Sequence, residues 1–436
     1  MESVWRRTAR LPSFPPLEGN AETEVLIVGG GMAGVLCAYF LKQAGVDCLL
    51  LEAETLGGGV TGNTTAKITS QHGLIYHKLT RSRGAEAARL YLELNQAALE
   101  RFRALCRDMD CDFQEQDAFV YSRSRDKLER EAAALNALGF PARLAGELPL
   151  PVPAAGAVCF PGQAQFHPLR FLAAIARGLP VHEHTKVLEL APGAAFTRRG
   201  TVRADRIILA THFPMLNKHG GYWLKLYQHR SYVLALRGAP AAGGMYVDED
   251  ERGLSFRDWG DLLLLGGGGH RTGKQGGGWA ELAAFAKKHY PQAREAGRWA
   301  AQDCMSLDGI PYAGLYSSGT EGLYTAAGFN KWGMTSSMAA ALVLADLVQG
   351  KENPYAGLLS PSRGMLRPQL AVNALEAAVS LLTPASPRCP HMGCALKYNP
   401  QEHSWDCPCH GSRFQEDGRL IDNPATDDLR SPPAGR

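Results

Sequence analysis

A short apolar segment that leads into a glycine-rich turn constrains the fold of this chain more than any other feature. Residues 24–28 (Glu-Val-Leu-Ile-Val) have the pattern of a buried strand, and residues 29–34 (Gly-Gly-Gly-Met-Ala-Gly) fit the spacing G-x-G-x-x-G. Apolar spacing predicts a helix over 35–44, and residues 47–51 predict a second strand that ends at Glu52. This order of elements is typical of a dinucleotide-binding βαβ unit, so we expect a parallel sheet with helices packed on it.

The glycines of this turn have separate physical roles. Gly29 makes the tight turn, Gly31 lets the backbone approach a pyrophosphate group, and Gly34 lets the helix pack closely on the strand. The N-terminus of the helix favours negative phosphate charge, and Glu52 is placed to accept hydrogen bonds from the adenosine ribose hydroxyls. The fingerprint by itself does not choose between NAD and FAD.

A second strong signal lies near the C-terminus, where two short segments each carry cysteine and histidine. The first contains Cys389 and His391, and the second contains Cys407 and His410. Two thiolates and two imidazoles suit a [2Fe-2S] centre in which one iron binds both cysteines and the other binds both histidines. Tetrahedral zinc is the alternative, because zinc takes the same ligand types. A cluster moves one electron at a time, so the rest of the chain is expected to exchange electrons with it.

The similarity of the two segments to a known pattern goes beyond four ligands. Residues 389–394 (Cys-Pro-His-Met-Gly-Cys) and 407–412 (Cys-Pro-Cys-His-Gly-Ser) resemble the two cluster-binding loops of Rieske proteins. By this resemblance, the second cysteine of each loop, Cys394 and Cys409, forms a disulfide that clamps the loops together. The cluster ligands that the resemblance implies are Cys389, His391, Cys407 and His410.

The segment before the first loop departs from the Rieske pattern. A helix is predicted over 368–382, and only residues 383–388 separate it from Cys389. A full Rieske domain has several strands at this place, which form a small base barrel. Most of that base is therefore missing here, and we expect the cluster either to be supported by the preceding domain or another subunit, or to be labile.

Several segments before residue 350 resemble the D-amino-acid oxidase/glycine oxidase-like family of FAD-dependent oxidoreductases. The segments are 61–67 (Thr-Gly-Asn-Thr-Thr-Ala-Lys), 166–169 (Phe-His-Pro-Leu), 183–187 (Glu-His-Thr-Lys-Val), 207–211 (Ile-Ile-Leu-Ala-Thr) and 308–312 (Asp-Gly-Ile-Pro-Tyr). The resemblance implies FAD as the cofactor, with Val187 by the adenine and Thr64, Thr65 and Lys67 near the pyrophosphate and flavin. A Rieske segment that follows such a chain resembles a known subgroup of the family.

A later segment is expected to return to the cofactor. Residues 324–328 (Tyr-Thr-Ala-Ala-Gly) predict a strand and a turn, and an Ala/Leu-rich helix follows from residue 333 to about residue 350. The N-terminus of such a helix stabilises negative charge on a reduced flavin ring. The cofactor-contacting residues expected here are Gly328, Gly333, Met334 and Thr335.

The chain is therefore expected to be α/β (α+β overall), with three parts. A Rossmann-like FAD-dependent oxidoreductase occupies residues 1–350, a linker with a short helix occupies 351–384, and a small, truncated Rieske-type β module occupies 385–436. Within the first part, the FAD-binding segments are about 22–75, 155–215 and 305–350, and the substrate segments are about 76–154 and 216–304.

The substrate part is expected to contain an antiparallel sheet that covers the flavin. Its strands are predicted from short apolar runs bounded by acidic and glycine turns, at 232–236, 245–247, 254–256 and 262–265. The glycines that follow, between 266 and 278, predict a loose, mobile loop around His270 and Arg271.

Charge and hydropathy exclude other classes of protein. A formal net charge of +3 over 436 residues gives no basis for binding nucleic acid. No stretch approaches the ~20 apolar residues of a spanning helix, so no membrane span is expected. Residues 11–16 (Leu-Pro-Ser-Phe-Pro-Pro) interrupt any signal-peptide core, which leads us to expect a cytoplasmic protein.

Three residues have catalytic potential. His72 and His270 could each lie over the flavin, although an isolated histidine is more often a packing residue. Lys67 could steady negative charge on the flavin, or form an ordinary salt bridge. In the family that the chain resembles, hydride passes from the amine carbon to flavin N5 and positioning does most of the work, so no dedicated base is required.

The expected function is that of an enzyme with a small-molecule substrate. It dehydrogenates a small amine or amino-acid-like compound and passes electrons singly to the Rieske cluster and then to an external carrier, although electron flow in the opposite direction stays open. Two alternatives also remain open. One is an O₂-using amine oxidase with a structural or regulatory cluster, and the other is a non-enzymatic flavin- and zinc-binding interaction protein.

Overall fold

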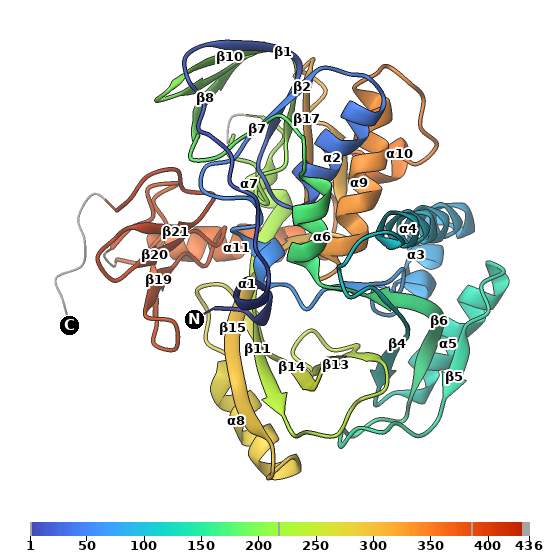
Figure 1. Ribbon diagram of the computed structural model, residues 1–436. Helices are drawn as coiled ribbons and strands as arrows, with labels where there is room; N and C mark the ends of the chain where they lie inside the picture. The colour runs from blue at the N-terminus through green and yellow to red at the C-terminus, as the bar shows by residue number, and fades with distance from the viewer. Residues whose placement is uncertain (1, 217–218, 385–386, 430–436) are drawn as a thin grey trace.

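The computed structural model describes residues 2–216, 219–384 and 387–429. Within these residues the chain forms a large body with two sheets and a small C-terminal module with a third sheet. Figure 1 shows the two large sheets in separate halves of the body, with the red C-terminal module at the left of both. The helices lie mainly around the first sheet and on the outer side of the second.

The first sheet has the parallel centre that the glycine-rich fingerprint predicts. Its strands, in spatial order, are β16 (Tyr312–Leu315), β17 (Leu323–Ala327), β10 (Gly200–Leu209), β1 (Ala21–Val28), β2 (Cys48–Leu51) and β7 (Val181–His182). β9 (Ala194–Thr197) also pairs with β10, and β8 (Val187–Ala191) pairs with β9. β1 pairs in parallel with β2 and β10, and β10 with β17. Because the carboxyl ends of these strands meet at one edge, the turn after β1 lies where such folds bind their cofactors.

The close packing of this turn depends on two glycines. α2 (Met32–Gln43) follows β1 directly, and a Cβ atom on Gly34 would lie 1.9 Å from the Gly29 carbonyl oxygen. Gly29 itself has φ +111°, and a Cβ there would lie 2.5 Å from the Ala210 carbonyl oxygen. Neither contact could be relieved by a side-chain rotation, because both involve backbone atoms.

Replacing Gly34 by alanine is therefore expected to lower the free energy of unfolding by about 1–3 kcal/mol, since overpacking forces the backbone apart. The same shift should reduce the amount of FAD that copurifies with the protein. Urea unfolding and flavin absorbance measure the two effects. Gly357→Ala in α10 (Ala356–Leu359) is the matched control, because no atom lies within 4 Å of the added Cβ. Equal stability and FAD content in the two variants would contradict the packing argument.

The helices cover the sheets largely as the apolar spacing predicts. α2 packs against α9 (Gly333–Leu347) at the first sheet. The other helices are α1 (Val4–Thr8), the 3₁₀ turn η1 (Val60–Asn63), α3 (Ile75–Arg83), α4 (Ala85–Cys106), α5 (Arg125–Ala137), α6 (Pro168–Ile175), α7 (Tyr222–Lys225), α8 (Gly278–His289) and α11 (Pro368–Leu382). No helix of the described residues is both long and apolar enough to cross a membrane.

The second sheet contains the predicted antiparallel strands and extends beyond them. Its order is β15 (Arg294–Ser306), β11 (Leu226–Arg237), β14 (Leu262–Arg271), β13 (Ser255–Trp259), β12 (Met245–Asp248), β4 (Gln114–Ser122), β6 (Gly156–Gln165) and β3 (Lys67–Ile68), with β5 (Arg143–Ala145) beside β6. β12 to β14 and β11 pair antiparallel, whereas β12 and β4 are parallel. β6 belongs to this sheet, although we expected residues 155–165 among the FAD-binding segments.

The prediction of a loose loop after residue 265 is wrong for the first half of that segment. β14 continues through the glycines to Arg271 and stays paired with β11. The glycines serve close packing instead of mobility: a Cβ on Gly268 would lie 2.3 Å from the Gly278 carbonyl oxygen, and one on Gly267 would meet the Leu254 side chain at 2.6 Å. The start of α8 therefore lies directly against this strand.

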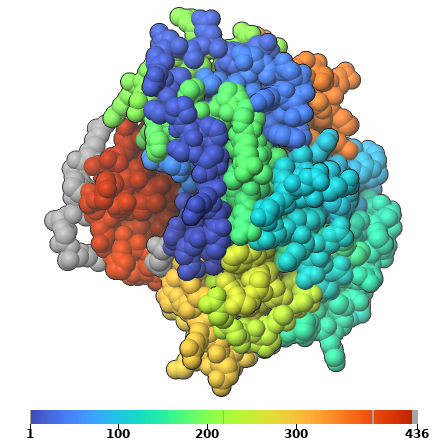
Figure 2. All heavy atoms as spheres, in the orientation of Figure 1, coloured from blue at the N-terminus to red at the C-terminus, as the bar shows by residue number. Residues whose placement is uncertain are grey.

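The C-terminal module is a small antiparallel sheet packed on the body. Its strands are β18 (Lys397–Asn399), β19 (Ser404–Asp406), β20 (Arg413–Gln415) and β21 (Leu420–Asp422), paired in that order. α11 precedes it over the predicted residues 368–382. Figure 2 shows the module, in red, against the N-terminal segment and the residues near 300.

Candidate active site and metal centre

A cavity of about 1590 Å³ is lined by residues of both large sheets and of the C-terminal module. Gly29 and Gly31 of the fingerprint turn form part of its wall, and Asp422 and Asn423 of the module form another part. This volume exceeds the roughly 300–1,000 Å³ of a pocket for one drug-sized ligand, so a dinucleotide and a small substrate fit together.

Glu52, directly after β2, forms a hydrogen bond with the fingerprint turn. Both carboxylate oxygens of Glu52 accept backbone hydrogen bonds, from Gly30 N at 2.6 Å and from Glu54 N at 2.8 Å. Burial raises the pKa of Glu52, although these two hydrogen bonds act to lower it. Glu52 lines the cavity, whereas Gly34 lies behind its wall in the packing role described above.

The residues expected near the pyrophosphate and flavin also line the cavity. They are Thr64, Thr65, Lys67 and Val187. Lys67 Nζ donates to Thr65 Oγ1 at 3.4 Å. Burial, with a smaller contribution from the Arg257 charge, lowers the pKa of Lys67 to about 7. An anionic group in the cavity would favour the protonated form of this amine, so Lys67 is suited to binding negative charge.

In the segment that was expected to return to the cofactor, some residues line the cavity and others lie behind its wall. Gly333 and Met334 at the start of α9 line the cavity, whereas Gly328 and Thr335 do not. Thr335 Oγ1 is within hydrogen-bond distance of Thr69 O and His72 Nε2, at 2.9 Å each. Gly328 has φ +70°, which glycine adopts without strain. Gly328 and Thr335 therefore support the wall.

His72 lines the cavity but is committed to the protein's own structure. Its Nδ1 contacts Tyr91 Oη at 2.6 Å, and its Nε2 contacts Thr69 O at 2.8 Å. Its ring stacks on Trp332 at 5.1 Å. Burial lowers the pKa of His72 to about 3. A neutral ring with both nitrogens in hydrogen bonds is a poor general base, so the geometry favours the packing interpretation.

His270 lies outside the lining of the large cavity, in a smaller depression formed with His229 and Arg271. Its Nε2 contacts Tyr232 Oη at 3.0 Å and its Nδ1 contacts Arg271 O at 2.9 Å. His270 belongs to β14, which continues to Arg271 where a loop was expected, and the strand places the ring in this smaller depression. The structure thus gives no support to a catalytic role for His270.

The predicted cluster ligands lie together in two adjacent loops. The thiols of Cys389 and Cys407 are close enough to shift each other's pKa, and the ring centroids of His391 and His410 lie 4.9 Å apart. His410 Nε2 donates to Trp223 O at 2.9 Å. Its Nδ1 is buried and finds no hydrogen-bond partner among the described residues. A ligating histidine has this arrangement, with the second nitrogen held by a backbone carbonyl.

The cysteines also suit metal binding. The Cys407 thiol and, to a smaller extent, the Ser412 hydroxyl lower the pKa of Cys389 to about 7, against the opposing effect of burial. The thiolate is the form that binds metal. Cys394 and Cys409 form the disulfide that the Rieske resemblance implies, and it joins the two ligand loops. Two thiols and two imidazoles gathered in this way fit a [2Fe-2S] cluster.

The body of the protein supplies the support that the short module lacks. Arg271 Nε donates to Pro408 O at 3.0 Å, and its Nη2 donates to Cys409 O at 3.2 Å. Gln302 Nε2 donates to Gly411 O at 2.9 Å. The second ligand loop, which contains all three of these carbonyls, is therefore held by β14 and β15. The sequence left open whether the preceding domain or another subunit supports the cluster loops, and in the structure the preceding domain contacts them.

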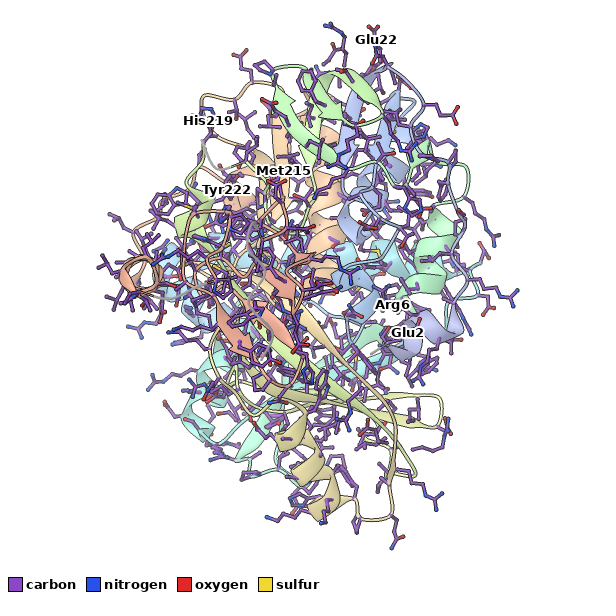
Figure 3. The ribbon with its side chains drawn as sticks, turned by 90° about the vertical axis from the view of Figure 1, so that its left-hand side faces the viewer. Glu2, Arg6, Glu22, Met215, His219 and Tyr222 are labelled. Carbon is purple, nitrogen blue, oxygen red and sulfur yellow. A yellow bond between two sulfur atoms is a disulfide. The ribbon has the colours of Figure 1, made fainter. Side chains whose placement is uncertain are left out.

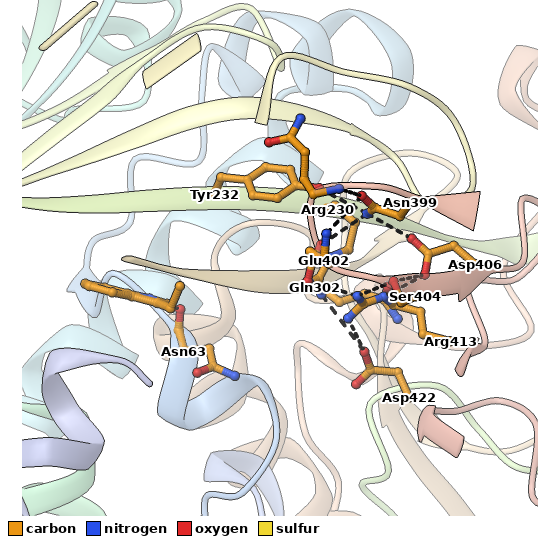
Figure 4. A network of polar contacts seen from close by, with 12 residues as sticks. Asn63, Arg230, Tyr232, Gln302, Asn399, Glu402, Ser404, Asp406, Arg413 and Asp422 are labelled. Carbon is orange, nitrogen blue, oxygen red and sulfur yellow. Dashed lines mark hydrogen bonds and ion pairs between the residues drawn. The ribbon is translucent and has the colours of Figure 1, made fainter. Parts of the chain in front are cut away.

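A buried ion network joins the module to β11 (Figure 4). Arg413 contacts Asp406 Oδ1 at 3.0 Å, Asp422 Oδ2 at 3.0 Å and Glu402 Oε2 at 2.9 Å. Glu402 also accepts from Arg230 Nε at 3.0 Å. The side chains of Arg230, Glu402, Asp406 and Arg413 are each at most 10% exposed. Removing one member would leave a buried charge without its partner, which is costly.

Sequence reasoning did not find Arg230 and Gln302, although both line the cavity and both contact the module. A signal was present. Residues 227–231 (Tyr-Gln-His-Arg-Ser) are polar within a strand whose other half is apolar, and Gln302 with Asp303 interrupts the apolar second half of another strand. Buried polar residues in a strand require hydrogen-bond partners, and for Arg230 and Gln302 these partners lie in the C-terminal module.

Two family models match the chain. The model of the FAD dependent oxidoreductases matches residues 24–347, and the model of the Rieske [2Fe-2S] domain matches residues 381–433. The first match covers well over half of the chain, and the second covers both ligand loops. The cofactors implied by these families are FAD and a [2Fe-2S] cluster, so the zinc interpretation of the loops is set aside.

Individual proteins agree with this assignment. The Bacillus subtilis (strain 168) protein YhfW, whose name describes a Rieske 2Fe-2S iron-sulfur protein, is 33% identical over 98% of this chain and 97% of its own. Gamma-glutamylputrescine oxidoreductase of Escherichia coli (strain K12) is 24% identical over 77% of this chain and 86% of its own. The structure of glycine oxidase from Geobacillus kaustophilus shares the fold, with TM-score 0.67 and 21% identity, over 79% of this chain and 100% of that one.

The fingerprint, the large cavity and the paired cysteine–histidine loops thus agree with the comparisons. The chain belongs to the FAD-dependent oxidoreductase family, as an enzyme in which a Rieske [2Fe-2S] domain follows the oxidoreductase domain.

Proposed function

We propose that this enzyme dehydrogenates a small amine or amino-acid-like substrate and passes the electrons singly to an external carrier by way of its cluster. FAD supplies a two-electron acceptor for such a substrate, and the Rieske cluster supplies a one-electron carrier. The names of two similar proteins, a gamma-glutamylputrescine oxidoreductase and a glycine oxidase, support an amine or amino acid as the substrate class.

The observation that carries the proposal is the position of Gln302. Its side chain lines the large cavity, and its Nε2 donates to the carbonyl of Gly411, the residue directly after the cluster ligand His410. Its Oε1 accepts from Thr272 Oγ1 at 3.0 Å, which holds the amide in this orientation. One side chain therefore spans from the cavity wall to the ligand loop, which supports electron exchange between the two sites.

Other residues of the chain complete the cavity. Lys67 provides an amine that negative charge would protonate, as its pKa of about 7 indicates. Arg257 is buried and donates to the Ala66 carbonyl at 2.9 Å, which holds the backbone beside Lys67. Asp422 and Asn423 bring the module to the wall itself, so the module also helps to exclude water from the site.

Anaerobic rapid mixing tests the proposal. The holoprotein is mixed with candidate substrates such as glycine, proline and a monoacylated diamine, and the flavin absorbance and the cluster signal are followed separately. We expect flavin bleaching first and cluster reduction second, within the time of one turnover. A cluster that keeps its redox state throughout turnover would contradict the proposal and leave direct oxidation by O₂, the alternative stated above. Iron and acid-labile sulfide analysis of the same sample confirms that the cluster is loaded.

A further inference from the structure

Helix α11 has its polar side chains inside and its apolar side chains outside. Asn373 and Ser380 are buried, where Asn373 Nδ2 donates to Leu224 O at 2.9 Å and Ser380 Oγ donates to Ala395 O at 3.3 Å. The exposed side chains of this fully described helix are all apolar: Pro368, Ala371, Val372, Ala374, Leu375, Ala378, Val379, Leu381 and Leu382. Figure 3 shows the helix end-on at the left edge of the molecule.

The polar face of α11 is already used by the protein itself. Asn373 Oδ1 accepts from Arg271 Nη1 at 2.9 Å, and Glu376 forms an ion pair with Lys274 at 2.7 Å. The helix is therefore fixed in its orientation by contacts with β14, with the segment after β14 and with the first ligand loop. It cannot turn its apolar face inward without losing these partners, and the exposed face requires another explanation.

The large exposed side chains repeat at the spacing of a two-helix contact. Val372, Leu375, Val379 and Leu382 are three, four and three residues apart, and their exposed fractions are 48%, 65%, 55% and 83%. This is a heptad pattern with valine at positions a and leucine at positions d. β-Branched residues at a with leucine at d favour a pair of parallel helices over higher assemblies.

The apolar surface is large enough for a stable interface. With Leu366 (89% exposed), Leu381 (43%) and Met392 (37%), the exposed parts of these side chains amount to about 700 Å², above the few hundred Å² usual for one patch on a monomer. Two copies that cover this surface would bury about 1,400 Å², inside the range of about 1,200–2,000 Å² of specific interfaces. Arg388 is exposed at the edge of this surface, beside Leu381 and Gly393, so an apolar centre has a charged rim, as is typical of homodimer interfaces.

We propose that α11 is a dimerisation helix, and that it packs against α11 of a second copy of this chain. A two-fold axis makes such a contact self-complementary, since each copy offers the same residues. A lipid surface fits less well. Interfacial helices are rich in Lys and Arg on their polar face, and α11 has no basic residue.

Sedimentation velocity of the FAD- and cluster-loaded protein tests this inference. We expect a mass twice that of the 47.1 kDa chain at micromolar concentration. Leu375→Glu should raise the dimer dissociation constant at least about 30-fold, the size expected for a residue at the centre of an interface. Leu144→Glu is the matched control, because Leu144 is 39% exposed on β5 and lies outside this helix. It should leave the mass unchanged.

A covalent test covers the case in which Leu375→Glu does not fold. Val379→Cys at an a position should yield a disulfide-linked dimer on mild oxidation, whereas Leu144→Cys should not. Flotation with phosphatidylcholine/phosphatidylglycerol vesicles tests the alternative that this face of α11 binds a lipid surface. A wild-type protein that stays monomeric at all concentrations would overturn the proposal. It would also be overturned by vesicle binding that Leu375→Glu abolishes, since the face would then contact lipid.

Discussion

Replacing Cys407 by serine is expected to remove the [2Fe-2S] cluster and to leave FAD in place. Cys407 lies beside Cys389, and its sulfur is within 4.8 Å of both disulfide sulfurs, so it stands at the centre of the two ligand loops. A serine hydroxyl is a hard ligand that stays protonated, and cluster iron is held by thiolates. The iron and sulfide content should therefore fall close to zero, while the flavin absorbance should persist.

The kinetic result of this substitution separates two functions. If electrons leave through the cluster, the variant should still bleach its flavin with substrate, and its transfer of electrons to a one-electron acceptor should fall at least about 100-fold, beyond the 10–100-fold effect of losing only a supporting contact. Unchanged turnover with O₂ in a cluster-free variant would instead mark the cluster as dispensable for oxidation.

Cys159→Ser is the control for this experiment. The Cys159 sulfur is buried in β6, far along the chain from the module, and lies 3.7 Å from Asp117 Oδ2 and 3.8 Å from Arg143 Nη2. A hydroxyl can keep these polar contacts, so the variant should retain iron, sulfide and FAD. Retention of full iron in Cys407→Ser, or loss of iron in Cys159→Ser, would argue against the ligand assignment.

Glu402→Gln is expected to have the largest effect on stability. Glu402 lies between Arg230 of the body and Arg413 of the module, and its side chain is 10% exposed. Removing its charge leaves two buried guanidinium groups short of a partner. Breaking a buried pair from one side typically costs about 3–5 kcal/mol. The module should therefore separate from β11 more easily, which would slow cluster reduction more than flavin reduction.

The same residue predicts how stability depends on pH. Burial acts to raise the pKa of Glu402, but Arg230 and Arg413 outweigh burial and lower the pKa to about 2, from an ordinary value of 4.5. The unfolded chain therefore binds this proton more readily than the folded protein does. The stabilisation is complete above pH 4.5 and is lost as the pH falls toward 2. The Gln variant should lack this loss.

Urea unfolding at several pH values between 7 and 3 measures both effects. Glu86→Gln is the matched control, since Glu86 is 67% exposed and pairs with Arg89 on the surface of α4. Such solvent-exposed pairs contribute little to stability, so this variant should follow the wild type at each pH. A Glu402→Gln protein with wild-type stability and wild-type cluster reduction would show that the network does not hold the module.

Local chemistry makes several features predictable from the amino-acid sequence alone. The βαβ unit around Gly29, the ligand loops with Cys389 and Cys407, and the helix over residues 368–382 each depend on residues close together in the chain. In such segments spacing alone determines which atoms can meet, because the rise per residue of a helix or strand is constant. The disulfide between Cys394 and Cys409 followed from the resemblance of these loops to a known family.

Tertiary packing decided the rest. Only the folded chain shows that the glycines near residue 268 form a strand against α8, that His270 lies outside the cavity, and that Gln302 reaches the carbonyl of Gly411. These residues meet partners that are up to 109 positions away in the chain. No periodicity along the chain encodes such distances. They are set by which faces of strands and helices become buried together, where each buried polar group must find a partner.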